Sequence, residues 1–376
     1  MSSSAVIAGY VRSPFTQATK GALARVRPDD LAAEVVLALI KKTGVNPADI
    51  EDLMLGCAFP EGEQGFNLGR IVVQLAGLPM EVAGVTVNRW CGSSMEAIHM
   101  AAGNIAAGKG EVFIAAGVES MSRIPMAGFN PLPNPALYQK MPAAYMSMGL
   151  TAENLARQFK IDRTAQEAFA IASHAKAAAA DMSGEIVGIT TKDGGVNKDG
   201  TIRATSTPED LAKLAPVFDA KGTVTAATSS PLTDGAAAVL VVSEAYAKKH
   251  KLPILARIKS MAVAGLDPAV MGLGPVHATK KALARAGLSV KDLDIIEINE
   301  AFAAQSIPCC QELGFDMKKV NIEGGAIALG HPLGASGARI TGKAALLLAR
   351  DKKAKYALAT ACIGGGQGIA TILEKV

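Results

Sequence analysis

Apolar and polar positions follow a pattern that occurs twice in this chain of 376 residues. Residues 29–59 have the spacing of an amphipathic helix, a helix end at Gly44 and then the apolar run of a strand. Residues 272–302 repeat that order at a constant offset of 243, which places Gly44 on Gly287. The pattern therefore predicts two similar segments, each with one helix followed by one strand.

The same offset aligns a second pair of segments. It places Cys91-Gly-Ser-Ser on Gly334-Ala-Ser-Gly, and each tetrapeptide begins an alanine-rich helical run that leads to an apolar strand. A chance resemblance between two ordinary helix–strand stretches is the alternative, but several element pairs at one offset favour duplicated α/β halves. Strands that alternate with helices predict parallel strand pairing, with helices covering the sheets.

The residues between the two repeats have a different composition. Residues 120–149 hold five prolines, two helical runs follow, and residues 190–216 are polar and typical of loops. The chain then returns to a strand, a helix and a second strand. We predict an N-terminal half at 1–119 that is completed by about 220–250, an inserted loop domain at 120–219, and a C-terminal half at 251–376.

Composition excludes several classes of protein. The net charge of +4 is spread along the chain, which argues against a nucleic-acid surface. Five cysteines without a CxxC pair predict neither a disulfide framework nor a zinc site, and indicate a reducing, cytoplasmic location. The first residues lack the pattern of a secretory signal, and Gly, Pro and charges interrupt every apolar run before it reaches the length of a membrane span.

A cysteine and a histidine stand where reactive side chains are expected. Cys91 begins a helix, where free backbone N–H groups and the helix dipole are expected to lower the pKa of its thiol. A buried cysteine acting as a small apolar residue is the alternative. His331 lies between Gly330 and Pro332 in a glycine-rich loop, and an imidazole there can take a thiol proton or donate to an oxyanion. The loop lacks the spacing of a nucleotide-binding motif.

Two further segments carry candidate chemistry. Asn299 follows an apolar strand at its carboxyl end, where open α/β sheets bind ligands, although an ordinary helix cap is the favoured interpretation of this segment alone. Cys362 ends a strand and precedes three glycines, which suits a proton shuttle beside an anion hole, whereas a tight turn with a buried thiol is the alternative. Spacing alone thus predicts a Cys/His acyl-transfer site with a candidate second Cys, and leaves the acyl group and its acceptor open.

The segments VNRWCGSSMEA, NEAFAAQ, GGAIALGHPLGASGAR and ACIGGGQG resemble the four signature blocks of the thiolase family, in the order of that family. The resemblance runs from end to end of the chain. It implies two similar halves with helices around mixed five-stranded sheets, layered α-β-α-β-α, with a loop domain inserted in the first half. It also implies a homodimer or a homotetramer.

The resemblance assigns roles to residues of the four blocks. Cys91 matches the nucleophile, His331 the base that activates it, and Cys362 the residue that exchanges a proton with the acetyl leaving group. Asn299 matches the residue that holds an ordered water, which with His331 forms one oxyanion hole. The backbone N–H groups of Cys91 and Gly364 match the second hole. The CoA-binding positions of the family fall on Met148, Arg203, Phe218, Ser230, Ala301 and Phe302.

The expected reaction is thiolytic cleavage of 3-ketoacyl-CoA by CoA to acyl-CoA and acetyl-CoA, in fatty-acid β-oxidation. CoA is a substrate, and the resemblance implies no metal or organic cofactor. The run after Cys91 is similar to the degradative branch, and Ser147 stands where the acetoacetyl-CoA-forming branch commonly has a His. That biosynthetic branch is the alternative, and a non-catalytic acyl-CoA- or lipid-binding relative, a decarboxylating condensing enzyme and a cysteine hydrolase are remoter ones. A hydratase/dehydrogenase subunit of an oxidation complex is a candidate partner.

Overall fold

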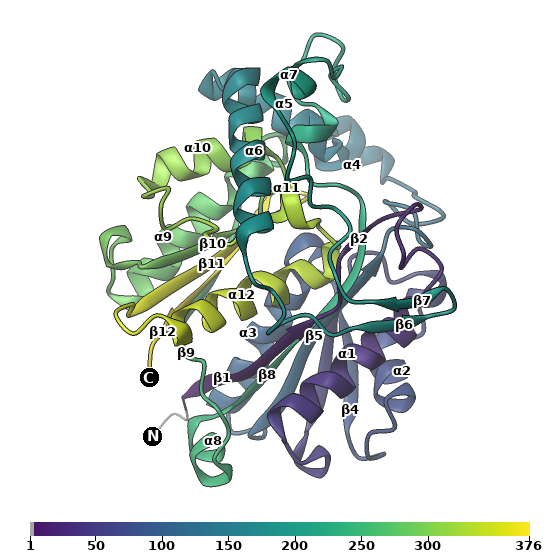
Figure 1. The fold of residues 1–376 in the computed structure, drawn as a ribbon, viewed down its shortest axis with the longest axis vertical. Coiled ribbons are helices and arrows are strands. Elements are labelled where there is room, and N and C mark those ends of the chain that lie inside the picture. Colours follow the sequence, from purple (N-terminus) through teal and green to yellow (C-terminus); the bar gives the residue numbers. More distant parts are fainter. Residues whose placement is uncertain (1–3) are drawn as a thin grey trace.

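A computed structural model describes residues 4–376, in which ten strands form one mixed sheet (Figure 1). The strands are β1 (Ala5–Arg12), β2 (Thr16–Gln17), β3 (Asp52–Gly56), β4 (Ala83–Val87), β5 (Val112–Ser120), β8 (Thr233–Ser243), β9 (Ala256–Gly265), β10 (Ile295–Ile298), β11 (Tyr356–Ile363) and β12 (Gln367–Glu374). Their order is β10-β11-β12-β9-β1-β8-β5-β3-β4, with β2 beside β8. The sheet confirms the predicted α/β class, but the parallel pairing expected from the alternation of helices and strands is wrong for β8 and β12, which pair antiparallel with their neighbours.

The two halves of this sheet pair their strands in the same way. In the first half β3 is parallel to β4 and β5, and β8 is antiparallel to β5 and β1. In the second half β10 is parallel to β11, and β12 is antiparallel to β11 and β9. Ile7 pairs with Ala256, so the halves join between β1 and β9. Within residues 4–376 the second half has four strands where five were expected, because the segment at Val320 keeps only one bridge, to Ile296.

The helices of the two halves also correspond. Helix α1 (Pro28–Thr43) ends at Gly44 with φ 70°, and α9 (Gly274–Ala286) ends at Gly287 with φ 68°. This left-handed conformation favours glycine, which explains why the repeat places glycine at both helix ends. Helices α3 (Ser93–Ala106) and α12 (Leu333–Arg350) form the second corresponding pair. The remaining helices of the two halves are α2 (Leu68–Leu75), α8 (Glu244–His250), α10 (Ala303–Leu313) and α11 (Ala326–Leu329).

The segment between β5 and β8 lies outside this repeat. It contains α4 (Pro135–Lys140), α5 (Met148–Phe159), α6 (Arg163–Ala179), α7 (Pro208–Ala212) and a hairpin of β6 (Ile189–Thr191) and β7 (Gly194–Val196). Strand β8 then enters the sheet between β1 and β5 (Figure 1). The domain limits of 119, 219 and 251 stay a prediction. Each helix within residues 4–376 is too short or too polar to cross a membrane.

Buried charges attach the inserted segment to both halves. Arg12, at the end of β1, is fully buried and forms ion pairs of 2.7 Å with Glu185 and with Asp199. Lys343 of α12 reaches Glu185 at 2.6 Å. Removing one partner of such a cluster leaves an uncompensated charge away from water, so the cluster fixes the position of the inserted segment.

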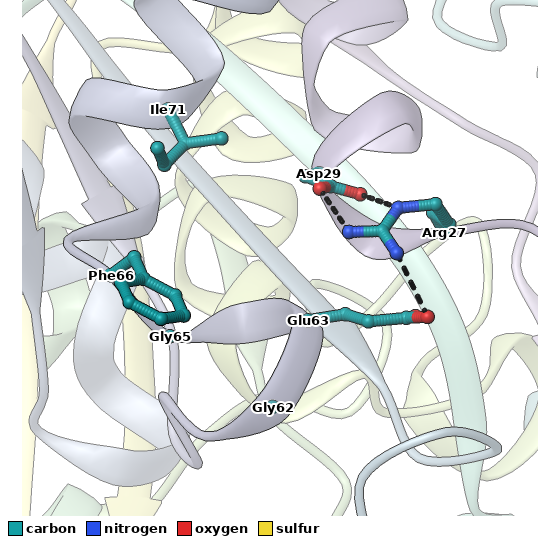
Figure 2. A pocket seen from close by; sticks show the side chains of 7 residues that line it. All are labelled: Arg27, Asp29, Gly62, Glu63, Gly65, Phe66 and Ile71. Atoms are coloured by element: carbon teal, nitrogen blue, oxygen red, sulfur yellow. Dashed lines mark hydrogen bonds and ion pairs between the residues drawn. The ribbon is translucent and has the colours of Figure 1, made fainter.

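Two shallow hollows on the surface lie away from the four signature segments. One, of about 270 Å³, lies beside α2 and is lined by Phe66 and by Arg27, which bridges Asp29 and Glu63 (Figure 2). The other, of about 260 Å³, lies at the carboxyl end of α5. None of the residues that line them belongs to the predicted site, so cavity size does not locate the chemistry here.

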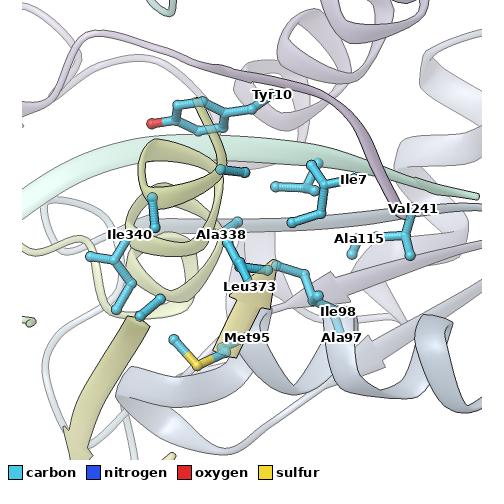
Figure 3. Close-up of a cluster of buried hydrophobic side chains, with 14 of the residues drawn as sticks. Ile7, Tyr10, Met95, Ala97, Ile98, Ala115, Val241, Ala338, Ile340 and Leu373 are labelled. Carbon is cyan, nitrogen blue, oxygen red and sulfur yellow. The ribbon is translucent and has the colours of Figure 1, made fainter. Parts of the chain in front are cut away.

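The largest apolar cluster lies between the two halves. Along β5, Phe113 and Ala115 face the central helices α3 and α12, while Ile114 faces α1 and α2. Along β11, Ala359 faces the same central helices, while Leu358 faces α9 and α10. Each half therefore has helices on both of its faces and shares the central pair, which is the predicted α-β-α-β-α layering. Figure 3 shows the side chains that meet there, among them Met95, Ile98, Ala338 and Ile340.

Candidate active site

Cys91 lies at the amino end of one of the two central helices. A single turn of 3-10 helix, Trp90–Gly92, leads directly into α3. Trp90 has a φ of 44°, and its N–H is held by the Asn88 side chain at 2.9 Å. A Cβ at Gly92 would lie 2.6 Å from Ile363 of β11, so the absence of a side chain there lets the two halves meet. The sulfur of Cys91 is thus held between the halves, with the residue only 7% exposed.

The expected low pKa of Cys91 is wrong. Burial raises the pKa of the thiol to about 11, although the backbone N–H groups of Gly364 and of Cys91 itself lower it. The loss of water around a charged sulfur outweighs the stabilisation that the helix start provides. Cys91 is therefore a neutral thiol at neutral pH, and a base has to remove its proton for it to act as a nucleophile.

His331 is a buried imidazole in the loop that precedes α12. Its backbone N–H donates to Thr233 at 3.1 Å, and its Nδ1 lies 2.5 Å from the hydroxyl of Ser336. The Ser336 hydroxyl donates its hydrogen to the carbonyl oxygen of Pro332 at 3.0 Å, so its oxygen accepts a hydrogen bond from Nδ1–H of His331. This network assigns the hydrogen to Nδ1 and leaves the lone pair on Nε2.

The charge state of His331 suits a base. Burial, and then the positive charge of Arg339, lower the pKa of the imidazole to about 3. The ring is therefore neutral at neutral pH. Leu333, two residues along the chain, packs in the same small cluster as Cys91, so the loop of His331 borders the nucleophile.

Asn299 contacts His331 directly. It follows β10, its backbone N–H donates to the carbonyl of Thr360 at 2.9 Å, and its Nδ2 lies 3.2 Å from Nε2 of His331. The other end of the amide, Oδ1, is buried and has no hydrogen-bond partner among residues 4–376. A buried acceptor of this kind is costly unless a donor from water or substrate reaches it. The ordered water implied by the resemblance stays a prediction.

Cys362 is the second thiol at the junction of the halves. It is fully buried in β11, and burial raises its pKa well above the ordinary value, with a further rise from the charge of Cys91. The two sulfurs therefore interact electrostatically. Gly364 follows in the turn to β12, where a Cβ would lie 2.3 Å from the Trp90 ring. The absence of a side chain at Gly364 lets its N–H reach the sulfur of Cys91.

Five of the six predicted CoA-binding residues lie together. The rings of Phe218 and Phe302 meet edge to face at 5.8 Å, and the N–H of Ser230 donates to the carbonyl of Ala301 at 2.9 Å. Met148, Ala301 and Phe302 share one apolar cluster with Cys362. These side chains therefore form a mostly apolar wall that is continuous with the second thiol.

Arg203 contacts helix α6. Its backbone N–H donates to Nδ1 of His174 on α6 at 3.1 Å, and its charge contributes, after burial, to lowering the pKa of His174 to about 4. Among residues 4–376 no hydrogen bond or ion pair joins Arg203 to the other predicted CoA-binding residues.

Two residues of the site escaped prediction from sequence. Ser336 orients His331, and Glu119, a buried carboxylate at the end of β5, adds a negative charge that acts on Cys91. The repeat contained a signal for both, because the offset of 243 aligns Ser336 with Ser93 and Cys362 with Glu119.

Comparison with known proteins gives a consistent result. The family description "Thiolase, N-terminal domain" matches residues 5–245, and "Thiolase, C-terminal domain" matches residues 252–375. A protein of Shewanella frigidimarina named 3-ketoacyl-CoA thiolase is 50% identical over 99% of both chains. One of the same name from a Marinomonas species is 51% identical over 99% of this chain and 98% of its own. The crystal structure of human mitochondrial 3-ketoacyl-CoA thiolase in complex with CoA has a TM-score of 0.91 and 37% identity, covering 100% of this chain and 98% of that one.

Proposed function

Because the chain belongs to the thiolase family, we propose that it cleaves 3-ketoacyl-CoA with CoA, giving acyl-CoA and acetyl-CoA in fatty-acid β-oxidation. One observation carries the proposal. The neutral imidazole of His331 is oriented by Ser336 and Asn299, on a loop whose Leu333 packs in one cluster with Cys91. A base without a charge next to a thiol without a charge suits transient removal of the thiol proton.

The first half of the reaction forms an acyl-enzyme. Nε2 of His331 takes the proton of Cys91 as the sulfur attacks the C3 carbonyl carbon. The C2–C3 bond then breaks, its electron pair becomes the enolate of acetyl-CoA, and Cys362 donates the proton that completes acetyl-CoA. In the second step Cys362 takes the proton of CoA as the CoA sulfur attacks the acyl-cysteine carbonyl. The bond from the acyl carbon to the Cys91 sulfur then breaks, and His331 returns its proton to that sulfur.

Two sets of donors stabilise the charges that develop on oxygen. After it has taken the thiol proton, His331 donates from Nε2 to the enolate oxygen, together with a water held by Asn299. The N–H groups of Cys91 and Gly364 receive the oxygen that becomes negative when a thiol adds to the thioester. One such preorganised donor contributes about 3–4 kcal/mol to the transition state.

The apolar wall continuous with Cys362 supports binding of the pantetheine arm of CoA. Phe218, Phe302 and Met148 give this wall its apolar surface, and Ser230 adds a hydroxyl for an amide of the arm. Arg203 contacts the phosphates in this proposal. The structure of the human mitochondrial protein with CoA bound supports CoA as the ligand of this fold.

We also propose a homodimer or a homotetramer located in the cytoplasm. Strand β4 ends the strand order, so one edge of the sheet is open within residues 4–376. Phe66 and Met80, which flank α2, are 92% and 70% exposed. Large exposed apolar side chains next to an open strand edge favour association of copies. Binding to a hydratase/dehydrogenase subunit is a further proposal, which co-purification of the two subunits tests.

The decisive experiment follows substrate cleavage with and without CoA. The wild-type protein is incubated with acetoacetyl-CoA and with longer 3-ketoacyl-CoA thioesters, and products are separated by mass. Cleavage that requires CoA supports the proposal. Cleavage that proceeds equally without CoA indicates a hydrolase, and binding without cleavage indicates a non-catalytic relative. The rate of condensation measured with acetyl-CoA alone is compared with the rate of cleavage to give the preferred direction.

Substitutions of Cys91 and of Cys362 test the separate roles proposed for their thiols. Cys91→Ala abolishes both turnover and acyl labelling. Cys362→Ala still forms the acyl-enzyme from a simple acyl-CoA but loses cleavage of the carbon–carbon bond. Cys310→Ala, which removes a buried thiol from α10, is the matched control and keeps both activities. Equal loss of labelling and cleavage in Cys362→Ala would contradict the assigned roles.

A further inference from the structure

The internal repeat gives the active site a structural counterpart that lacks the two thiols. At the offset of 243 residues, Cys91 corresponds to Gly334 and Cys362 corresponds to Glu119. Cys91 and Gly334 stand at the starts of the two central helices, and Cys362 and Glu119 are the penultimate residues of β11 and β5. In both copies, a strand end of one half meets a helix start of the other half.

In the second copy the strand residue binds the helix start. Oε2 of Glu119 accepts the backbone N–H of Gly334 and that of Ala58, each at 2.8 Å. Oε1 accepts the N–H of Phe59 at 3.2 Å and the side-chain amide of Gln64 at 2.8 Å. The carboxylate therefore spans the two halves with four hydrogen bonds while it is 1% exposed.

These contacts favour a charged carboxylate. Each of the four groups is a donor, and the thiol of Cys57 approaches at 3.7 Å as a fifth. A proton on Glu119 would have no acceptor and would displace a donor. Burial raises the pKa of Glu119 above its usual value, and the donors from Ala58, Gly334, Gln64 and Phe59 oppose that rise without cancelling it. Within residues 4–376 it forms no ion pair, so its charge is held by hydrogen bonds alone.

The segments that Glu119 binds are the ones that enclose the nucleophile. Ala58 and Leu333 pack in one cluster with Cys91, and Phe59 packs against that cluster. We propose that Glu119 is a positioning residue for the reaction proposed above. Its carboxylate holds the loop from His331 to Gly334, which belongs to the second half, against the strand ends of the first half that surround Cys91.

The charge of Glu119 also has an effect on the pKa of Cys91, which can be measured. After burial and the opposing N–H groups, the charge of Glu119 is a further cause that raises the pKa of the Cys91 thiol. Substitution of a residue that only supports the fold would change the stability of the protein and leave the pKa of the Cys91 thiol unchanged. Alkylation of Cys91 by iodoacetamide across pH reports that titration, and it does not require turnover.

The test is Glu119→Gln, which keeps the size of the side chain and removes its charge. The new NH₂ group faces donors, so the loop of His331 shifts, and we expect kcat to fall by about 100-fold with KM for CoA within about two-fold. The pH midpoint of Cys91 alkylation moves to a lower value than in the wild type. A folded variant with wild-type kcat, or with an unchanged alkylation midpoint, would overturn the proposal.

A matched control separates positioning from loss of stability. Glu153 is another buried carboxylate, which accepts the N–H groups of Thr223 and Val224, and Glu153→Gln is expected to lower the melting temperature without moving the alkylation midpoint. A midpoint that moves equally in this control overturns the proposal. If Glu119→Gln does not fold, Gln64→Met removes one of the four donors, and its kcat falls by about three- to ten-fold at unchanged KM. Wild-type protein that cleaves no 3-ketoacyl-CoA refutes the proposed function instead, and the alkylation result is independent of it.

Discussion

The hydroxyl of Ser336 decides which nitrogen of His331 is the base, so Ser336→Ala is a direct test of the site. In the wild type, Nδ1–H donates to this hydroxyl over 2.5 Å, and Nε2 keeps its lone pair toward Asn299. Without the hydroxyl, Nδ1–H is buried with no acceptor, which costs about 1–3 kcal/mol. The ring escapes this cost by moving its hydrogen to Nε2. Oδ1 of Asn299, which has no partner among the described residues, accepts that hydrogen after a rotation of the amide.

The expected effect follows from that shift. A tautomer with hydrogen on Nε2 cannot take the proton of Cys91, so the active fraction falls with the energy of the lost hydrogen bond. Since about 1.4 kcal/mol corresponds to a tenfold change in rate, kcat for thiolysis of acetoacetyl-CoA falls by about 5- to 150-fold. The steady-state rate gives kcat, and the ¹⁵N shifts of the labelled imidazole give the tautomer.

Ser306→Ala is the control for this variant. Ser306 is also fully buried in a helix, and within the described part of the chain its hydroxyl makes one hydrogen bond, to the side-chain oxygen of Gln305 at 3.3 Å. We expect its kcat and its imidazole spectrum to match the wild type. If Ser336→Ala keeps wild-type kcat, or if its hydrogen stays on Nδ1 while kcat falls, the account of how His331 is oriented is refuted.

Three further predictions follow from burial of charge. The rate of Cys91 alkylation rises about tenfold per pH unit from pH 7 toward the thiol pKa of about 11, and a plateau near neutral pH would reveal an ion pair instead of two neutral groups. Burial lowers the pKa of His99 to about 3 in the folded protein. As the pH falls below about 6.5, His99 therefore takes up a proton in the unfolded chain but not in the folded one. The free energy of unfolding consequently decreases from pH 6.5 toward pH 3. At pH 5 this costs about 2 kcal/mol in urea unfolding, and His99→Gln reduces the loss; an unchanged loss contradicts the assignment. Arg12→Met leaves Glu185 and Asp199 without their cation and lowers the free energy of unfolding by about 3–5 kcal/mol, whereas a loss below about 1 kcal/mol would show that the cluster reorganises.

The parts of the fold that were predictable are those that local sequence encodes. Glycine at a left-handed helix end, as at Gly44 and Gly287, is a local requirement, so the two copies of the repeat can be aligned from their residues alone. Alternation of helices and strands predicted parallel pairing, which holds for β3 with β4 and β5 and for β10 with β11, whereas the mixed sheet and the layers were implied by the family resemblance. Five strands were expected in each half, and the reduction of the fifth strand of the second half to one bridge, Val320 with Ile296, was not predictable because pairing there depends on contacts made across the sheet.

For the site, the sequence predicted which side chains lie close together better than it predicted their pKa values. The contact of Asn299 with His331 lies at the place that the signature blocks suggested. The pKa of Cys91 was predicted in the wrong direction, since a helix start is visible in sequence but the burial of a sulfur between two halves is not. Glu119 was missed for a related reason: its partners Ala58 and Gly334 are far apart in the chain and meet only after the halves pack.

The position of β8 has a consequence for how the polypeptide is made. Its residues pair with β5, Val112 opposite Val242, and with β1, Ala5 opposite Ser243. A ribosome therefore delivers the entire inserted segment before the strand that joins β1 to β5 exists, a wait of about 10 s at ordinary elongation rates. Throughout that time the nascent strands keep apolar edges without partners, which makes them a target for chaperones and a hazard for aggregation. A chain terminated at residue 232 should consequently be insoluble, while release at residue 250 allows the N-terminal sheet to close.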